Sequence, residues 1–227
     1  MTPPTPEAAS RLHAVFTLLA EHYGRPAWRH GGDAVAQLVS TILSQNTSDI
    51  NTERAFRSLR AAFPSWQDVI DAPTSAVIAA IRSGGLANQK APRIQQALRQ
   101  IQQQNGSFDL SHLATMPVHE ARAWLMRLPG VGAKTASIVL LFSMQRPAFA
   151  VDTHVHRLSR RLGLAPGNAT PERVMHIIEE AAPADWLYPL HINLIRHGRV
   201  VCKARRPRCT TCFLQDHCLF FSTAHRK

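Results

Sequence analysis

Apolar residues recur along most of this chain with the three- to four-residue spacing of an α-helix. Segments 12–19 and 35–43 each carry Leu, Val, Ile or Phe at positions i, i+3, i+4 and i+7. The same spacing predicts further helices over 52–62, 74–82, 88–104, 117–127, 133–144, 153–162, 171–181 and 185–198. No stretch alternates apolar and polar residues for long enough to predict a β-strand. The pattern therefore predicts an all-α protein of about ten short helices.

The composition is that of a globular protein with a polyanionic partner. Of 227 residues, 45% are hydrophobic and 18% are charged, and the formal net charge is +11 with a pI near 10.7. Nucleic acid is the common partner of so basic a protein, although a generically basic soluble protein has the same balance. We find neither a basic amphipathic helix that would indicate a membrane surface nor a signal peptide. We therefore expect a cytoplasmic protein, associated with the nucleoid if it binds DNA.

The segment "LPGVGAKT" (128–135) lies between two predicted helices and reads as a helix–hairpin–helix turn. Its prolyl residue ends the first helix, and Gly130 and Gly132 permit positive φ angles and leave no Cβ in the way. Backbone N–H groups at the start of the second helix would then bind a DNA phosphate without reading sequence. Leu128 and Val131 complete this predicted contact. The alternative is a plain turn between packed helices.

Two residues near this turn have candidate chemistry. Lys134 falls in the first turn of the second helix, where the positive end of the helix dipole favours a neutral, nucleophilic amine. Asp152, in "VDTHVHR", is placed to cap the next helix and could also stabilise a developing cation or move protons. The alternatives are a phosphate-binding or solvated lysine and an aspartate that only caps.

All four cysteines lie within seventeen residues, Cys202, Cys209, Cys212 and Cys218. This concentration, without an export signal, predicts a metal site and not a disulfide framework. Spacing alone leaves both zinc and a [4Fe–4S] cluster open. The loop between the first two cysteines is strongly basic, and we expect its charges to contact DNA phosphates or to balance the charge of the metal site. These charges belong to Lys203, Arg205, Arg206 and Arg208.

Three motifs in order resemble the endonuclease III family of DNA glycosylases. They are "LPGVGAKTASIVL", "AVDTHVHRLSRRLGL" and the spacing C-x6-C-x2-C-x5-C, and the resemblance extends from about Leu38 to Cys218. The resemblance implies a [4Fe–4S] cluster on the four cysteines. It also implies a bifunctional glycosylase and abasic-site lyase that flips oxidised pyrimidines out of duplex DNA, acting as a monomer.

The resemblance also implies roles for single residues. Lys134 would attack C1′ of the flipped nucleotide, with Asp152 assisting, and the resulting Schiff base would permit β-elimination. Loops 43–49 and 85–91 would fill the vacated space, and the residues that resemble the family's DNA contacts are Gln45, Asn46, Leu86 and His154. Asn46 departs from the family's usual Gln, and Ala87 from its usual Tyr, so the lesion preference is open.

The resemblance further implies two helical lobes on either side of a DNA-binding cleft. Residues 27–146 would form a six-helix barrel with the hairpin, and residues 1–26 with 147–227 would form the cluster lobe. Adenine mismatch glycosylases resemble the chain less, because Ser40 stands where they have a catalytic Glu. Thymine/uracil mismatch glycosylases of the same superfamily remain an alternative, as does a DNA-binding or redox-sensing module without catalysis.

Overall fold

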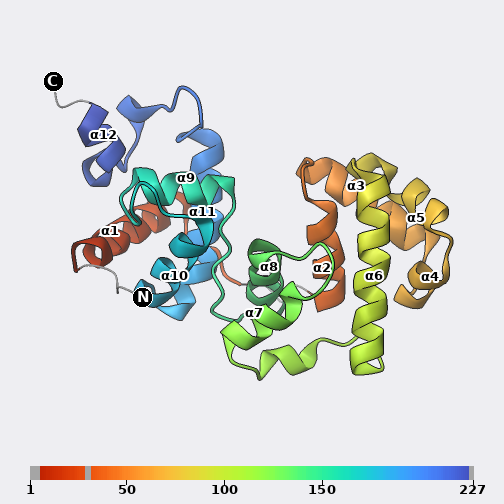
Figure 1. The fold of residues 1–227 in the computed structure, drawn as a ribbon. Helices are drawn as coiled ribbons and strands as arrows, with labels where there is room; N and C mark the ends of the chain where they lie inside the picture. Colours follow the sequence, from red (N-terminus) through yellow and green to blue (C-terminus); the bar gives the residue numbers. More distant parts are fainter. Residues whose placement is uncertain (1–5, 29–31, 225–227) are drawn as a thin grey trace. The chain divides into compact units, whose positions relative to one another are not determined.

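The computed structural model describes residues 6–28 and 32–224 and divides the chain into two compact units. One unit combines Met1–Arg29 with Pro147–Lys227, and the other covers His30–Arg146. The described residues form helices, turns and loops and contain no β-strand, so the all-α prediction is confirmed (Figure 1). Each unit has its own buried core.

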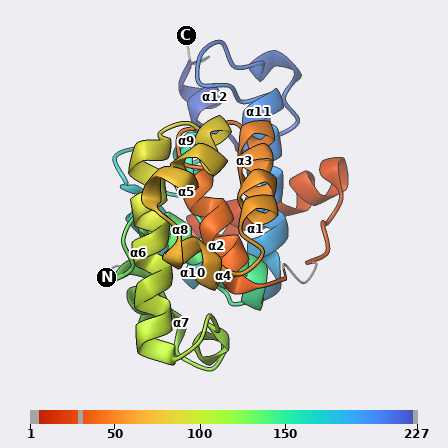
Figure 2. The ribbon, with the colours of Figure 1, turned by 90° about the vertical axis from the view of Figure 1, so that its right-hand side faces the viewer.

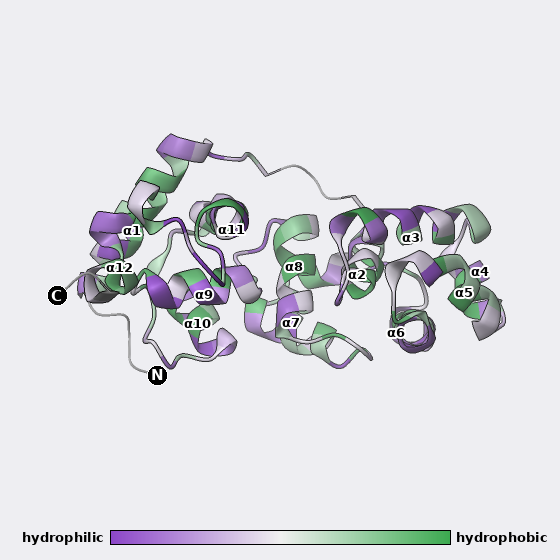
Figure 3. Ribbon diagram, turned by 90° about the horizontal axis from the view of Figure 1, so that it is seen from above, coloured by the Kyte–Doolittle hydropathy of each residue, from purple (hydrophilic) through white to green (hydrophobic). Residues whose placement is uncertain are grey.

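The unit His30–Arg146 is built around two apolar helices, α2 and α8, which pack on one another. Its helices are α2 (Ala34–Leu43), α3 (Asp49–Ala62), α4 (Trp66–Asp71), α5 (Thr74–Ile81), α6 (Ala87–Asn105), α7 (Val118–Met126) and α8 (Ala133–Met144), with short 3₁₀ helices η1 (Arg82–Gly84) and η2 (Ser111–Ala114). Figure 3 shows α2 and α8 largely hydrophobic, whereas α3 carries hydrophilic residues. Leu38 and Ile42 of α2 and Val139 and Leu140 of α8 are fully buried, and their burial provides the main driving force for this unit.

Helix α6 is the long helix of this unit and runs beside α4 and α5 (Figure 2). Its buried face is not wholly apolar, since Lys90 and Gln95 are each 1% exposed. The Nε2 amide of Gln95 donates hydrogen bonds to the carbonyl oxygens of Val69 and Ala72, both at 2.9 Å. These bonds satisfy carbonyl groups left free at the end of α4, so a polar side chain joins α6 to α4.

The other unit joins the first helix of the chain to the last third of the sequence. Its helices are α1 (Pro6–Tyr23), α9 (Thr153–Arg161), α10 (Pro171–Ala181), α11 (Leu187–Val200) and α12 (Leu219–Ala224), with 3₁₀ helices η3 (Ala184–Trp186), η4 (Cys209–Thr211) and η5 (Gln215–His217). Helix α11 packs against both α1 and α9. Asn193 of α11 donates a hydrogen bond to the carbonyl of Gly24, 2.9 Å away, and so fixes the chain just after α1.

The helical spacing in the sequence predicted most of these elements. The ranges 133–144 and 171–181 agree to the residue, and α11 begins at Leu187, not at 185, because η3 takes the preceding residues. The short helices α4 and α12 were not predicted, since six residues are too few to show a period. None of the helices in the described part of the chain combines the length and hydropathy needed to cross a membrane.

Asp33 supports the entry into α2 through two hydrogen bonds. One carboxylate oxygen accepts from the N–H of Val35 at 2.9 Å, and the other accepts from the indole N–H of Trp66 at 3.0 Å. We expect Asp33→Ala to lower the free energy of unfolding by about 1–2 kcal/mol, because it removes a helix cap and leaves the indole without its acceptor. Urea denaturation measures this change. The control is Glu180→Ala, at an exposed position of α10, which should change the free energy of unfolding by less than about 0.5 kcal/mol. An equal loss of stability in both variants would contradict the stabilising role of the Asp33 hydrogen bonds.

Candidate active site and metal centre

The hairpin between α7 and α8 is anchored by its apolar residues and turns at Gly130. Leu128 and Val131 are buried, whereas Gly132 is exposed. Gly130 has φ +80°, a backbone conformation that favours glycine. A Cβ there would lie 3.1 Å from Cδ of Arg93, so that side chain would have to shift. Gly132 differs from the prediction: its φ of −99° and ψ of 178° are extended backbone that any residue adopts. A Cβ on Gly132 would meet no protein atom within 4 Å.

The N-terminus of α8 is open to an anionic ligand. Gly132 is its N-cap and provides no side-chain hydrogen bond to the first turn. The first N–H groups of a helix have no partner within the helix, and they bind anions where no side chain caps them. Lys134 stands in this first turn with an exposed side chain, so its amine is accessible beside the predicted phosphate site.

The loop between α2 and α3 (residues 44–48, the first loop) is joined to the hairpin. The Nε2 amide of Gln45 donates a hydrogen bond to the carbonyl oxygen of Gly130, 3.0 Å away. Asn46 is exposed and has φ +54°, a left-handed conformation that Asn tolerates better than most residues. The amide nitrogen of Gln45 is thus used within the protein, while the side chain of Asn46 faces solvent.

The segment between η1 and α6 (residues 85–86, the second loop) presents an exposed leucine. Gly85 and Leu86 have φ angles of +66° and +49°, and the Leu86 side chain is 47% exposed. Residues 87–91, predicted as part of this loop, are instead the first turns of α6. Ile50, 71% exposed at the start of α3, is a second apolar side chain in solvent. Sequence reasoning missed it, although it is the most exposed of the large hydrophobic residues described.

Lys90 connects the starting points of both loops. Its Nζ donates hydrogen bonds to the carbonyl oxygens of Leu43, at 2.6 Å, and Gly84, at 2.8 Å. Burial lowers the pKa of this amine, because the charged form loses its hydration. No local pattern indicated this role, since a lysine in the first turns of a helix is ordinarily solvated.

In the other unit, Asp152 caps α9 as predicted. Its Oδ1 accepts a hydrogen bond from the N–H of Val155 at 2.7 Å, and the residue is half-buried. His154, in the first turn of α9, has its Nδ1 3.1 Å from a guanidinium nitrogen of Arg157. Because a guanidinium is donor-only, this Nδ1 is the acceptor. Lys134 and Asp152 belong to different units.

Two arginines of α9 bind the segment that carries the first cysteine. Arg157 donates to the carbonyl oxygen of Cys202 through Nε at 3.1 Å and through Nη2 at 2.9 Å. One turn later, Arg161 donates to the Sγ of Cys202 at 3.3 Å and to the carbonyl oxygens of Lys203, at 2.8 Å, and Ala204, at 3.1 Å. The helix that begins at Asp152 is therefore joined to the cysteine segment by charge-assisted hydrogen bonds.

The four cysteines line one largely apolar cavity together with side chains of α9 and α12. Among the described residues, no group of three or more His, Cys, Asp or Glu side chains surrounds the position of a single ion. Burial raises the pKa of the Cys212 thiol to about 11. Thiolates there must therefore be stabilised by the bound metal itself, whose binding releases protons. Four thiolates in an apolar pocket fit a [4Fe–4S] cluster, which takes four Cys ligands.

His197 is a buried neighbour of the cysteines that the sequence analysis did not identify. It is 1% exposed, and burial lowers its pKa to about 4, so the imidazole is neutral at neutral pH. Its Nε2 lies 3.4 Å from Sγ of Cys212 and its Nδ1 lies 3.1 Å from the Tyr23 hydroxyl. The tautomer that donates from Nε2 to sulfur leaves Nδ1 to accept from Tyr23, and this arrangement satisfies both contacts.

The basic loop between Cys202 and Cys209 presents its charges to solvent. The side chains of Lys203, Arg205, Arg206 and Arg208 are all exposed. The N–H groups of Lys203 and Arg208 both donate to the carbonyl oxygen of Val201, each at 3.0 Å, and Arg206 has φ +52°. The hydrogen bond from Arg208 back to Val201 therefore joins the two ends of the loop.

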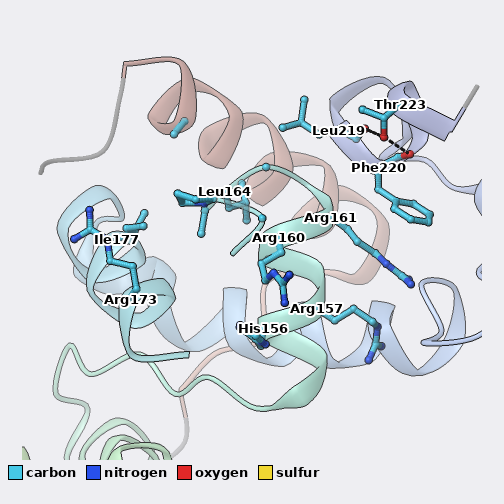
Figure 4. Close-up of a pocket in the computed structure, with 15 residues that line it drawn as sticks. His156, Arg157, Arg160, Arg161, Leu164, Arg173, Ile177, Leu219, Phe220 and Thr223 are labelled. Carbon is cyan, nitrogen blue, oxygen red and sulfur yellow. Dashed lines mark hydrogen bonds between the residues drawn. The ribbon is translucent and has the colours of Figure 1, made fainter. Parts of the chain in front are cut away.

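A second cavity in the same unit, of about 910 Å³, is lined in part by residues of α9, α10 and α12. Figure 4 shows that Arg157, Arg160, Arg161 and Arg173 line it but point in different directions. Two of these, Arg157 and Arg161, donate their hydrogen bonds to the cysteine segment. The arginines therefore do not converge on one anion.

Comparison with known proteins identifies the family. Residues 39–184 match the model of the HhH-GPD superfamily of base excision DNA repair proteins, and residues 202–218 match the iron–sulfur binding domain of endonuclease III. Endonuclease III of Thermotoga maritima is 37% identical over 189 residues, which are 83% of this chain and 84% of that protein. Endonuclease III of Escherichia coli K12 is 35% identical over 212 residues, covering 92% and 95%.

Solved structures agree with this result. The structure of a trapped endonuclease III–DNA covalent intermediate matches with a TM-score of 0.80 and 27% identity, over 96% of this chain and 99% of that chain. A thermostable thymine-DNA glycosylase matches with a TM-score of 0.79 and 18% identity, over 94% and 98%. The second similarity shows a shared fold alone.

The contacts of Arg161 predict a role in retaining the cluster. We expect Arg161→Met to lose the visible absorbance of the cluster about tenfold faster under a chelator, because each charge-assisted hydrogen bond contributes about 1.5–3 kcal/mol. The matched control is Arg160→Met on the same helix, since the Arg160 side chain is exposed and makes no hydrogen bond among the described residues. Equal rates of loss in the two variants would contradict the role.

Proposed function

Since the chain belongs to the endonuclease III family, within the HhH-GPD superfamily of base excision repair proteins, we propose that it removes oxidised pyrimidines from duplex DNA and cuts the strand through a lysine Schiff base. The chain is a DNA glycosylase and abasic-site lyase with a [4Fe–4S] cluster. We expect it to act as a monomer on chromosomal DNA, in the cytoplasm at the nucleoid.

We assign Lys134 as the nucleophile because of which lysine amines are accessible. The chain has four lysines, Lys90, Lys134, Lys203 and Lys227. Within the unit His30–Arg146, Lys90 is buried and hydrogen-bonded, so Lys134 is the lysine whose amine is exposed. Its position beside the open N-terminus of α8 would bring a bound phosphodiester close to the amine.

The proposed reaction proceeds by covalent catalysis. The neutral Nζ of Lys134 attacks C1′ of the flipped nucleotide, the N-glycosidic bond breaks, and the base leaves with a proton. Ring opening gives the Schiff base. Loss of a proton from C2′ then expels the 3′ phosphate and nicks the strand. Asp152 would stabilise the cationic sugar and carry protons, using the carboxylate that already accepts from Val155 to fix its orientation.

The two loops would replace the flipped nucleotide. Leu86 is an exposed apolar side chain that can enter a base stack, and the exposed amide of Asn46 can probe the orphaned base. Gln45 would support Asn46 through its bond to Gly130. The hairpin would bind a phosphate through its backbone, and His154 would line the site from the start of α9. A panel of duplexes with thymine glycol, dihydrouracil, uracil·G and an abasic site separates the oxidised-pyrimidine proposal from a thymine/uracil mismatch activity.

The nucleophile is tested by borohydride trapping on an abasic-site duplex. We expect a covalent adduct with the wild-type protein and none with Lys134→Ala, because only an amine forms a reducible imine. Lys203→Ala is the matched control, since it removes the other exposed lysine among the described residues. An adduct that persists in Lys134→Ala would reassign the nucleophile. Retained duplex binding without any adduct in the wild type would indicate a non-catalytic DNA-binding module.

The basic loop is tested by the salt dependence of duplex binding. We propose that Arg205 and Arg206 contact phosphates, and each lost contact should lower the slope of log K against log salt by about 0.9. The double variant Arg205→Ala/Arg206→Asn should therefore lower it by about 2. Asn at 206 tolerates the left-handed backbone of that position. An unchanged slope would contradict these phosphate contacts, and loss of the cluster absorbance would show that the loop serves the cluster more than the DNA.

A further inference from the structure

Lys90 lies at a junction that the proposed chemistry does not use. Its side chain is 1% exposed, and its Nζ donates to the carbonyl of Leu43, at 2.6 Å, and to that of Gly84, at 2.8 Å. Leu43 is the last residue of α2, directly before the first loop, and Gly84 is the last residue of η1, directly before the second loop. One amine thus holds the starting points of the loops that carry Asn46 and Leu86.

The partners of this amine are carbonyl groups, which is an uncommon environment for a buried lysine. Burying an ammonium group is costly unless it is well paired, and the one cause of its lowered pKa is the loss of hydration. The carbonyl end of α2 supplies the negative end of a helix dipole and offsets part of this cost. Even the neutral amine keeps two N–H donors, which is enough for both hydrogen bonds.

The packing around this junction leaves the two loops little freedom. A Cβ on Gly84 would lie 3.1 Å from Cβ of Ala55 and 4.0 Å from the carbonyl oxygen of Leu43. The second loop therefore lies close to both α3 and the end of α2. Residues with positive φ angles set the path of the backbone in each loop. They are Asn46 in the first loop and Gly85 with Leu86 in the second. A small change at Gly84 or Leu43 would therefore be transmitted to the exposed residues.

Helix α6 also supports the hairpin. Cδ of Arg93, three residues after Lys90, lies 3.1 Å from where a Cβ on Gly130 would be, so the Arg93 side chain packs against the hairpin. Gln45 of the first loop donates to the carbonyl of the same Gly130. Residues in the first turns of α6 thus contact the segments just before both loops, and also the hairpin.

We propose that Lys90 is a positioning residue, which sets the separation of the two loops so that Leu86 and Asn46 enter a duplex together when a nucleotide is flipped. This inference rests on the proposed function, because it takes the loops as the elements that enter the duplex. It predicts a selective defect. Base excision from a duplex requires both loops, since the space left by the flipped nucleotide must be filled. In single-stranded DNA, β-elimination at an abasic site leaves no orphaned base and no base stack to fill.

The test compares single-turnover strand cleavage on two substrates, a thymine glycol duplex and a single-stranded abasic oligonucleotide, at saturating enzyme. Lys90→Met keeps an unbranched apolar chain but removes every donor. We expect its rate on the duplex to fall at least about tenfold more than its rate on the single strand, because misplacement by about 1 Å can cost about a hundredfold. Equal losses on both substrates would overturn the proposal, as would an unchanged duplex rate.

Gln95→Met is the matched control for lost stability. Gln95 lies on the same helix, is also 1% exposed, and also donates to two backbone carbonyls, but at Val69 and Ala72. Its replacement should change the two cleavage rates by the same factor, measured on protein whose folded fraction is set by circular dichroism. A selective duplex defect in Gln95→Met as large as that in Lys90→Met would contradict a specific role for Lys90.

A second variant keeps the inference testable should Lys90→Met fail to fold. Gly84→Ala retains the amine and places a methyl group 3.1 Å from Cβ of Ala55, which displaces the start of the second loop by a few tenths of an ångström. We expect the same selective loss on the duplex, of about threefold or more, and an unchanged ratio would overturn the proposal. Failure of the proposed function has a different signature, because the wild-type protein itself would then leave the thymine glycol duplex uncut.

Discussion

The carbonyl groups at the end of α2 and η1 must find hydrogen-bond donors inside the protein, and the Lys90 amine is the donor they find. A buried carbonyl without a partner costs about 1–3 kcal/mol, so this requirement ties the two segments to α6. The exposed residues of both loops then follow from where those segments end. In this unit the elements proposed to meet DNA are placed by a buried contact that itself remains out of reach of DNA.

The second unit uses the same physical solution with arginine. Arg157 and Arg161 lie on α9, and their guanidinium groups satisfy carbonyl groups of the cysteine segment. Arginine suits this task because its planar group offers several donors in fixed directions. The helix that begins at Asp152 and the segment that begins at Cys202 therefore form one hydrogen-bonded body. The cluster ligands and the capping carboxylate are connected through two turns of helix, without any direct contact between them.

Local signals in the sequence were sufficient for most of the helices, for the Asp152 cap and for the grouping of the cysteines, because these depend on neighbours within a few residues. Lys90 and Arg161 could not be identified in this way, since Lys90 has a partner 47 residues away and Arg161 has one 41 residues away. Gly132 misled the prediction for a related reason, because an extended glycine and a left-handed one look the same in the sequence. The role of His197 depends on a core contact with Tyr23, 174 residues earlier, which no local pattern reveals.

The distribution of lysine has a chemical consequence for an enzyme of this family. Only four of the 26 Lys and Arg residues are lysines, and one of those is enclosed at the junction of the two loops. An opened abasic sugar is an aldehyde, which condenses with any accessible amine but not with a guanidinium group that stays protonated. The chain thus carries its positive charge almost entirely on groups that are inert toward such an aldehyde, which would meet few competing amines.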